Sequence, residues 1–180
     1  MKKIFISIIF VGIFIFSANA QVTVSGAAGI TDGTSYSTLK LAFDAINAQT
    51  QTASNNILIA ISDNTTETAT AVLNAGGWNS LTIYPTAVKT ISGNVDGPLV
   101  DLNGADNVTI NGQINQTSGN KDLTISNTST SSTAANSPST IRYINDATNN
   151  TLKYCYILGS ETVSSVSGYG SGIIFFSTSF

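Results

Sequence analysis

The sequence predicts an all-β protein folded as a parallel β-helix, in which each winding of the chain adds short strands to parallel sheets. Three observations predict this fold. Short runs of alternating aliphatic residues recur along most of the chain, clusters of Asn and Gly separate these runs, and one nine-residue pattern occurs twice. An amphipathic helix precedes the strands, and we expect it to cap the first winding.

The first twenty residues have the features of a secretory signal peptide. Lys2 and Lys3 precede an apolar run over residues 4–16, and small residues follow up to Ala20. The apolar run is shorter than the roughly 20 residues that span a bilayer. We therefore expect cleavage after Ala20 and export to the medium or the outer cell surface, with no stable membrane span afterwards. An uncleaved anchor is the alternative.

The rest of the chain is acidic and carries few charges. The whole sequence has 7 basic and 10 acidic residues; removing Lys2 and Lys3 leaves 5 basic residues and a net charge of −5. This balance argues against nucleic acid as a partner, because such binding needs clustered Lys and Arg. Cys155 is the single cysteine, so the chain has no internal disulfide.

The domain organisation follows the change in hydrophobic period. After the signal peptide at residues 1–20, residues 21–36 form a polar lead-in, and residues 37–49 form the capping helix. Residues 55–180 form the windings of the β-helix. Because the sequence stops inside an apolar run without a polar cap, we expect the windings to be truncated at the C-terminal end.

The capping helix is predicted from residues that fall on one helical stripe: Leu39, Ala42, Phe43 and Ile46. Ser37 is expected to cap the N-terminus of this helix. Lys40 and Asp44 lie four residues apart, so we expect them to pair on the exposed side.

The strands are predicted as runs of about three to five residues, separated by Gly, Asn and Ser-Pro corners. They are Ile57–Ile61, Leu81–Pro85, Thr90–Gly93, Leu99–Leu102, Val108–Gly112, Asp122–Ser126, Thr140–Ile144, Thr151–Leu158 and Gly172–Phe176.

The repeat aligns Leu102–Ile110 with Ile144–Leu152. If the offset between these segments spans two windings, each winding holds about 21 residues, and the windings are roughly equal in length. Asn103 and Asn145 then share one corner, where Asn adopts a left-handed backbone easily and stacked amides bond to each other.

The stretch TLKYCYI, Thr151–Ile157, fits the same geometry. We expect Tyr154 at a corner, with Leu152, Cys155 and Ile157 pointing inward. Cys155 is then a small buried apolar residue. A reactive thiol is the alternative, although no cationic neighbour is present to lower its pKa.

Six stretches of the chain resemble a known group of proteins. They are YSTLKLAFDAIN, NTTETATAVLNAGGWNSLTIYP, ISGNVDGPLVDLNGADNVTING, KDLTISNTSTS, STIRYINDATNNTLKYCYILGS and GIIFFSTS. They closely resemble the N-terminal region of large secreted bacterial surface proteins with right-handed parallel β-helix (pectin-lyase-like) repeats, which usually end in a type IX secretion sorting domain. The resemblance implies a right-handed β-helix and export, and it carries no settled activity.

The sequence offers weak candidates for a metal site and none for catalysis or a cofactor. Asp96, Asp101 and Asp106 are evenly spaced, and their carboxylates suit Ca²⁺. The simpler interpretation is that they are turn residues beside Gly and Asn, and Ca²⁺ binding is the alternative. The repeat alignment places Arg142 and Asp101 in neighbouring but unequal columns two windings apart, which makes a poor catalytic cluster. Within the stretch TIRYI, Arg142 is most simply a solvated outward residue.

We therefore expect a non-catalytic surface module for adhesion or contact with a polysaccharide or surface glycan. Asn, Thr and Ser would supply many weak hydrogen bonds from an almost uncharged wall. Five tyrosines are candidates for stacking on sugar rings or for filling corners: Tyr84, Tyr143, Tyr154, Tyr156 and Tyr169. A polysaccharide lyase or hydrolase with its active site beyond Phe180, and a structural stalk, are the alternatives.

Overall fold

The computed structural model describes residues 21–131, 138–160, 162 and 172–178. The predicted signal peptide at residues 1–20 lies outside the described residues. The elements are β1 (Val22–Ser25), β2 (Thr34–Tyr36), α1 (Leu39–Asn47), β3 (Asn56–Ile61), β4 (Thr65–Glu67), β5 (Ala71–Asn74), β6 (Ser80–Pro85), β7 (Lys89–Gly93), β8 (Pro98–Asn103), β9 (Val108–Asn111), the 3₁₀ turn η1 (Ile114–Gln116), β10 (Leu123–Asn127), β11 (Ser139–Ile144), β12 (Thr151–Lys153), β13 (Cys155–Gly159) and β14 (Ile174–Phe176).

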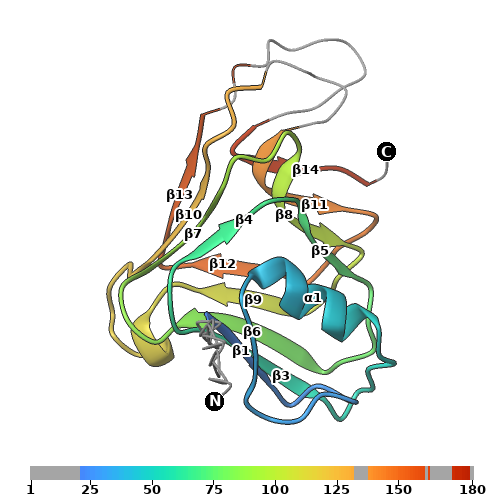
Figure 1. Cartoon of the computed structure of the whole chain (residues 1–180). Helices are drawn as coiled ribbons and strands as arrows, with labels where there is room; N and C mark the ends of the chain where they lie inside the picture. The colour runs from blue at the N-terminus through green and yellow to red at the C-terminus, as the bar shows by residue number, and fades with distance from the viewer. Residues whose placement is uncertain (1–20, 132–137, 161, 163–171, 179–180) are drawn as a thin grey trace, which may run out of the picture.

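From β3 onward, hydrogen bonds join every third strand of the chain, and three sheets result (Figure 1). The strand order is β12-β9-β6-β3-β1-β2 in sheet A, β13-β10-β7-β4 in sheet B and β14-β11-β8-β5 in sheet C. Neighbouring strands are parallel except at β1, which runs antiparallel to both β2 and β3. The chain is therefore mostly β with parallel sheets, as the sequence predicts.

The inward side chains of the three sheets meet in one hydrophobic cluster. They lie in rows of register partners, such as Ile59, Ile83, Ile110 and Leu152 in sheet A, and Leu73, Leu102 and Tyr143 in sheet C. Burying one such aliphatic or aromatic side chain contributes about 1.5–3 kcal/mol to stability. These rows are therefore the main favourable term that holds the sheets together.

The predicted helix is observed as α1, and its buried residues are the predicted ones: Leu39, Ala42, Phe43 and Ile46. The predicted N-cap is wrong, because the cap is Thr38 rather than Ser37. Thr38 has an extended backbone, and its hydroxyl accepts a hydrogen bond from the Leu41 N–H at 3.2 Å. The predicted Lys40–Asp44 pair is present, with 2.6 Å between nitrogen and oxygen.

Helix α1 lies beside β5, at the end of sheet C opposite β14 (Figure 1). The Asn47 side chain joins the two elements: its amide donates to the Val72 carbonyl at 2.8 Å, and its oxygen accepts from the Asn74 N–H at 3.0 Å. The helix therefore satisfies part of a strand edge that would otherwise be open. No helix in the described residues is long and apolar enough to cross a bilayer.

The repeat offset spans one winding, so the prediction that it spans two windings of equal length is wrong. Thr109 and Thr151 are paired across the adjacent strands β9 and β12. The windings are also unequal, because the partners Ile59 and Ile83 of β3 and β6 lie closer in sequence than the partners Ile83 and Ile110 of β6 and β9. Strand pairing fixes the position of each strand, whereas adding residues to a connecting loop costs little conformational entropy. The number of residues per winding is therefore free to vary.

The predicted column of asparagines at one corner is confirmed. The Asn145 amide donates to the Asn103 side-chain oxygen at 2.5 Å, and the Asn103 amide donates to Asn74 at 2.9 Å. Asn145 has φ 53°, and the nearby Asn107 and Asn149 have φ 58° and 54°. Asn tolerates this left-handed backbone better than most residues do, which explains its frequency at these corners.

The prediction for TLKYCYI is also confirmed. Tyr154 has φ 55° and forms the corner between β12 and β13. Leu152, Cys155 and Ile157 are partly buried against the hydrophobic cluster.

Candidate functional site

Arg142 and Asp101 form an ion pair on sheet C, contrary to the prediction that Arg142 is solvated and two windings away. The two residues are register partners in the adjacent strands β11 and β8. Arg142 Nε and Nη2 donate to the two carboxylate oxygens of Asp101 at 2.9 and 2.7 Å. The side chains are 16% and 4% exposed, so this two-bond pair is largely withdrawn from water.

The alignment failed here because the offset differs between sheets. The partners Asp101 and Arg142 in sheet C are separated by one residue fewer than the partners Thr109 and Thr151 in sheet A. One additional residue therefore enters at the later corner between these sheets. One offset applied to the whole alignment therefore pairs the strands of sheet A correctly but displaces those of sheet C by one residue.

The other two candidate metal ligands lie on separate parts of the winding. Asp106 is at a corner, where its carboxylate accepts from the Thr148 N–H at 2.5 Å and from the Thr148 hydroxyl at 2.8 Å. Asp96 is exposed between β7 and β8. Among the residues described, no three His, Cys, Asp or Glu side chains form a group that could hold a metal ion. The three aspartates are therefore not brought together as a Ca²⁺ site.

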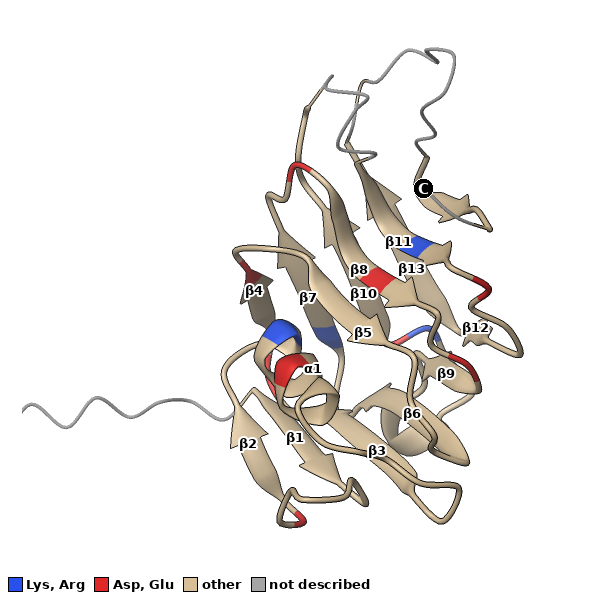
Figure 2. Ribbon diagram, turned by 90° about the vertical axis from the view of Figure 1, so that its right-hand side faces the viewer, with Lys and Arg blue, Asp and Glu red and all other residues tan. Residues whose placement is uncertain are grey.

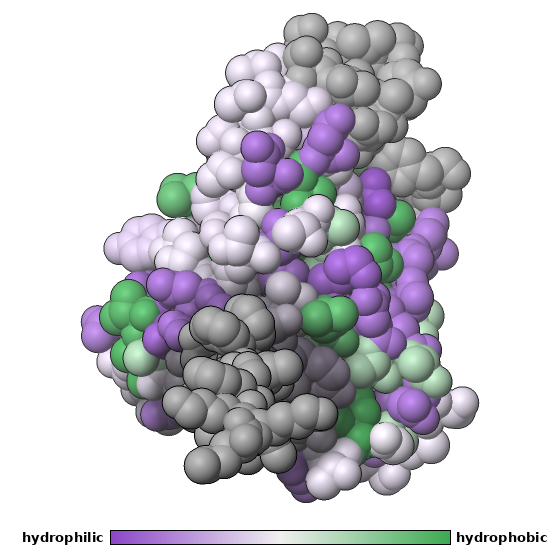
Figure 3. Space-filling view, in the orientation of Figure 1, coloured by the Kyte–Doolittle hydropathy of each residue, from purple (hydrophilic) through white to green (hydrophobic). Residues whose placement is uncertain are grey.

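The outer face of sheet B carries aligned hydroxyl groups. Thr90 of β7 pairs in register with Thr124 of β10, and Ser92 pairs with Ser126. These side chains are partly exposed, and in the space-filling view this side of the molecule is pale, near the middle of the hydropathy scale (Figure 3). Register partners in adjacent strands lie about 4.8 Å apart, so the hydroxyls form two short rows.

Both rows end in apolar side chains on β13. Tyr156 continues the Thr90–Thr124 row, and Leu158 continues the row of serines. Tyr156 is 52% exposed, and the Lys121 ammonium lies 5.3 Å from the centre of its ring. The outer face of sheet B thus combines hydroxyls with one exposed aromatic ring.

Sheet A has a similar row on its outer face. Thr82, Thr109 and Thr151 are register partners in β6, β9 and β12. Figure 2 marks the charged residues, and they lie mainly at corners, on α1 and on the Asp101–Arg142 pair rather than along these threonines. The outer walls are therefore rich in neutral hydrogen-bonding groups.

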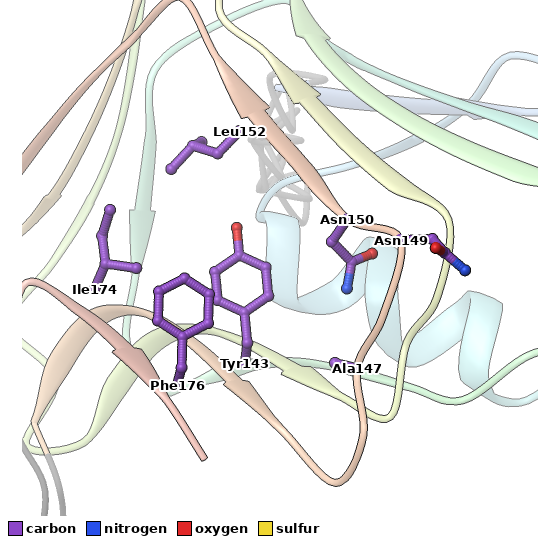
Figure 4. A pocket seen from close by; sticks show the side chains of 7 residues that line it. All are labelled: Tyr143, Ala147, Asn149, Asn150, Leu152, Ile174 and Phe176. Carbon is purple, nitrogen blue, oxygen red and sulfur yellow. The ribbon is translucent and has the colours of Figure 1, made fainter. Parts of the chain in front are cut away.

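A second candidate site is a pocket at the last strand of sheet C. Tyr143 of β11 and Phe176 of β14 stack face to face, with ring centres 4.8 Å apart and an interplanar angle of 10°. Phe176 is 70% exposed. The pocket has a volume of about 430 Å³, and its lining residues are Tyr143, Ala147, Asn149, Asn150, Leu152, Ile174 and Phe176 (Figure 4).

The Tyr143 hydroxyl points into this pocket, toward the space between Leu152 and Asn150 (Figure 4). Tyr143 is only 7% exposed, and burial raises the pKa of its hydroxyl to about 12. Within the described part of the chain this hydroxyl has no hydrogen-bond partner. It is therefore a neutral group that is able to donate to, or accept from, a bound molecule.

A more polar hollow adjoins the same two rings. Asp146, Thr148, Ser177 and Thr178 line it together with Tyr143, Ala147 and Phe176, and its volume is about 350 Å³. Asp146 lies at the Asn145–Asn149 corner and has φ 60°. The aromatic pair therefore has apolar side chains on one side and hydroxyl and carboxylate groups on the other.

Cys155 has no features of a reactive thiol. Burial raises its pKa to about 11, and the hydrogen bond from the Gly112 backbone, which lowers the pKa, is the smaller effect. The thiol is therefore protonated near neutral pH and packs as a small apolar group.

Sequence reasoning named Tyr143 and Tyr156 only as members of a set of tyrosines, and it missed the role of Phe176. GIIFF is an apolar run whose pairing partner lies far away in the sequence, so the stacking on Tyr143 has no local signal. Tyr169 lies outside the described residues.

Comparison with known proteins adds no further assignment. No family model, no curated protein and no solved structure matches this chain.

Proposed function

We propose that this chain is a secreted or cell-surface module, built as a right-handed parallel β-helix, that contacts carbohydrate without catalysis. Its neutral outer walls bind a polysaccharide or a surface glycan weakly at many points, in an adhesive role. The resemblance to secreted bacterial surface proteins and the signal-peptide pattern at residues 1–20 support export to the medium or the cell surface.

The strand pairing supports the β-helix. The chain passes through sheets A, B and C in turn, as β3, β4 and β5 and then as β6, β7 and β8, and each strand pairs in parallel with the strand three positions later. Crossovers between parallel strands of one sheet are almost always right-handed, which supports the handedness. The capping position of α1 and the asparagine column agree with this interpretation.

The observation that carries the function is the outer face of sheet B. Its hydroxyl rows end at Tyr156, a ring that is half exposed and lies in register with Thr124 and Thr90. Sugars present hydroxyls around the edge of a ring and apolar C–H groups on its faces. Hydroxyl rows match the edge, and an aromatic ring matches the face.

The experiment is binding of the full chain to a glycan array and to insoluble polysaccharides, measured by depletion from solution. We expect retention on a subset of neutral glycans and no dependence on added Ca²⁺. The variant Tyr156→Ala removes the exposed ring and should weaken retention several-fold. Tyr154→Ala is the matched control, because Tyr154 is also exposed but lies at the corner between β12 and β13.

An empty array with correctly folded protein would contradict the proposal and favour a structural stalk. Equal retention of the Tyr156→Ala and Tyr154→Ala variants would show that the outer face of sheet B is not the binding face. Release of unsaturated or reducing sugars during incubation would instead indicate an enzyme.

A further inference from the structure

We propose that the outer face of sheet B prefers a glycan with an acidic group, a carboxylate or a sulfate, and that Lys121 binds this group beside Tyr156. This inference rests on the proposed contact with carbohydrate and narrows the class of sugar that binds most tightly. Tyr156 is an exposed, outward residue of β13, so the site lies on the outside of the winding, away from the hydrophobic cluster.

Lys121 and Lys153 differ from the other basic side chains of the described residues, because neither pairs with a carboxylate. Both lysines are exposed. Each of the other three basic side chains pairs with an aspartate, and the pairs are Lys40–Asp44, Lys89–Asp63 and Arg142–Asp101. In this part of the chain two cations are therefore available to an anionic group from outside the protein.

The backbone places both lysines at the base of the loop formed by residues 112–122, at the corner between sheets A and B. The Gly112 N–H donates to the Lys153 carbonyl at 2.9 Å, and the Asp122 N–H donates to the Gly112 carbonyl at 2.8 Å. Lys121 directly precedes Asp122, so the two lysines flank Gly112 on consecutive windings. The positive charges therefore gather at the edge of sheet B where the hydroxyl rows meet β13.

The Lys121 ammonium lies over the ring of Tyr156, 5.3 Å from its centre. This cation–π contact holds the charge close to the ring. Lys121 is exposed and Tyr156 is half exposed, so both remain accessible from solvent. A sugar that packs on the free part of the ring therefore brings its exocyclic groups near the ammonium.

The acidic residues at this corner are already engaged. Asp122 is only 8% exposed, and its Oδ2 accepts from the Ile114 N–H at 3.2 Å and from the Ser118 hydroxyl. Asp63 pairs with Lys89 at 3.3 Å. The field around Lys121 is therefore locally favourable to an anion, although the whole chain has a net charge of −3.

Lys121 sets a preference rather than the contact itself. The hydroxyl rows and the ring serve neutral and acidic sugars alike, whereas only an acidic group gains from the ammonium. An exposed ion pair contributes modestly, so an acidic glycan should bind about two- to fivefold more tightly than a neutral glycan of the same shape. Salt should reduce this advantage, because it screens exposed charges.

The test is titration of the full chain with two matched pairs of glycans, followed by calorimetry. The first pair is an oligouronate and its methyl ester, and the second is a sulfated galactan and its desulfated form. We expect the acidic member of a pair to bind about two- to fivefold more tightly at low salt, and the two members to bind equally in about 1 M NaCl. Comparison of the pairs shows whether carboxylate or sulfate is preferred.

Variants of single lysines locate the acidic group. Lys121→Gln should lower the affinity for the acidic glycan to that for its neutral counterpart, and Lys121→Arg should keep the preference, because it keeps the charge. Lys153→Gln should cause a smaller decrease. Lys40→Gln is the matched control, since it removes the same charge from α1 and should leave the preference unchanged. Unfolding curves establish that each variant is folded.

Two results would overturn the inference: equal affinity of the wild type for the acidic and neutral members of both pairs, and equal losses from Lys121→Gln and Lys40→Gln. The second result would mean that net charge, rather than this site, decides binding. If neutral glycans are still retained through Tyr156 in these cases, the proposed function stands while the acidic preference fails. If no glycan binds to folded protein, both fail.

Discussion

Glu67 on β4 binds the N-terminus of helix α1 through hydrogen bonds. Its side chain is buried, and its two carboxylate oxygens accept hydrogen bonds from the Leu39 and Lys40 N–H groups at 2.9 and 3.0 Å. These N–H groups belong to the first turn of α1, where backbone donors lack partners and the helix dipole favours negative charge. Glu67 thereby connects the first winding to its cap.

We predict that Glu67→Gln lowers the free energy of unfolding by about 1 kcal/mol, and Glu67→Ala by about 2–3 kcal/mol. The first variant keeps one acceptor but loses the charge, whereas the second leaves both N–H groups unsatisfied. Urea unfolding followed by circular dichroism measures the change. Asp44→Asn is the control, since the exposed Lys40–Asp44 pair contributes less than about 1 kcal/mol. Equal effects of Glu67→Ala and Asp44→Asn would contradict the capping role.

Tyr143 and Cys155 should make the protein sensitive to alkali. Burial raises the pKa of Tyr143 from 10.0 to about 12 and that of Cys155 from 9.0 to about 11. In each case the unfolded chain loses its proton at lower pH than the folded chain does. Stability is therefore complete below about pH 9 and falls as the pH rises toward 11 and 12.

The measurement is urea unfolding between pH 8 and the onset of irreversible damage, with wild type and Cys155→Ala compared. The variant should lose less stability between pH 9 and 11, because the ionisation of Cys155 no longer contributes. Parallel stability curves for the two proteins would show that the thiol does not contribute to the alkaline transition.

At the scale of elements, Arg142 and Asp101 join β11 to β8 by a two-bond ion pair. Removing one partner from a largely buried pair leaves an unpaired charge, whereas replacing both with apolar residues is often tolerated. The pair therefore fixes the register of sheet C more than it adds net stability.

We predict that Asp101→Leu destabilises the protein by about 3 kcal/mol, and that the double variant Asp101→Leu with Arg142→Leu recovers most of this loss. A double-mutant cycle from denaturant unfolding gives the coupling free energy. Additive effects of the two substitutions would mean that the charges act independently.

Asn127 also links neighbouring strands. It is buried and lies at the end of β10, at the corner before β11. Its amide nitrogen lies 3.0 Å from each of three carbonyl oxygens, those of Val95, Gly97 and Ser139. Its side-chain oxygen accepts from the Val95 and Ser129 N–H groups at 3.2 Å each. One asparagine thus satisfies backbone groups of two windings, where a corner has no strand partners.

At the scale of the molecule, the two ends of the stacked strands differ. One end is closed by α1, β1 and β2, whereas among the described residues β12, β13 and β14 each pair on one side only. The exposed apolar residues on these strands include Tyr156, Leu158, Ile174 and Phe176. A strand with hydrogen-bonded partners on both sides opens less readily than a strand with one partner, so protection should follow the position of each strand in its sheet.

We predict that amides of β6 and β9 exchange with solvent at least about ten times more slowly than those of β13 and β14. The first two strands have partners on both sides, and within the described part of the chain the last two do not. Hydrogen exchange followed by mass spectrometry measures this gradient. Uniform protection across all windings would show that the stack opens only as a whole.

Alternation of aliphatic residues and the asparagine corners determined most of the local structure. These signals predicted the strands, the inward face of α1, the Tyr154 corner and the Asn103–Asn145 contact, because each depends on residues close in the chain or on a short repeated pattern. They missed the short strands β4 and β5, whose three or four residues show too little alternation to stand out.

The tertiary structure alone decided which distant residues meet. Two quantities decide these contacts: the number of residues in each loop, and the corner at which an additional residue enters. They set the winding lengths, the Asp101–Arg142 pair, the Glu67 cap and the Tyr143–Phe176 stack. Loop length has a small energetic cost and leaves little mark on composition, whereas a one-residue change in register reverses the direction of every later side chain in a strand.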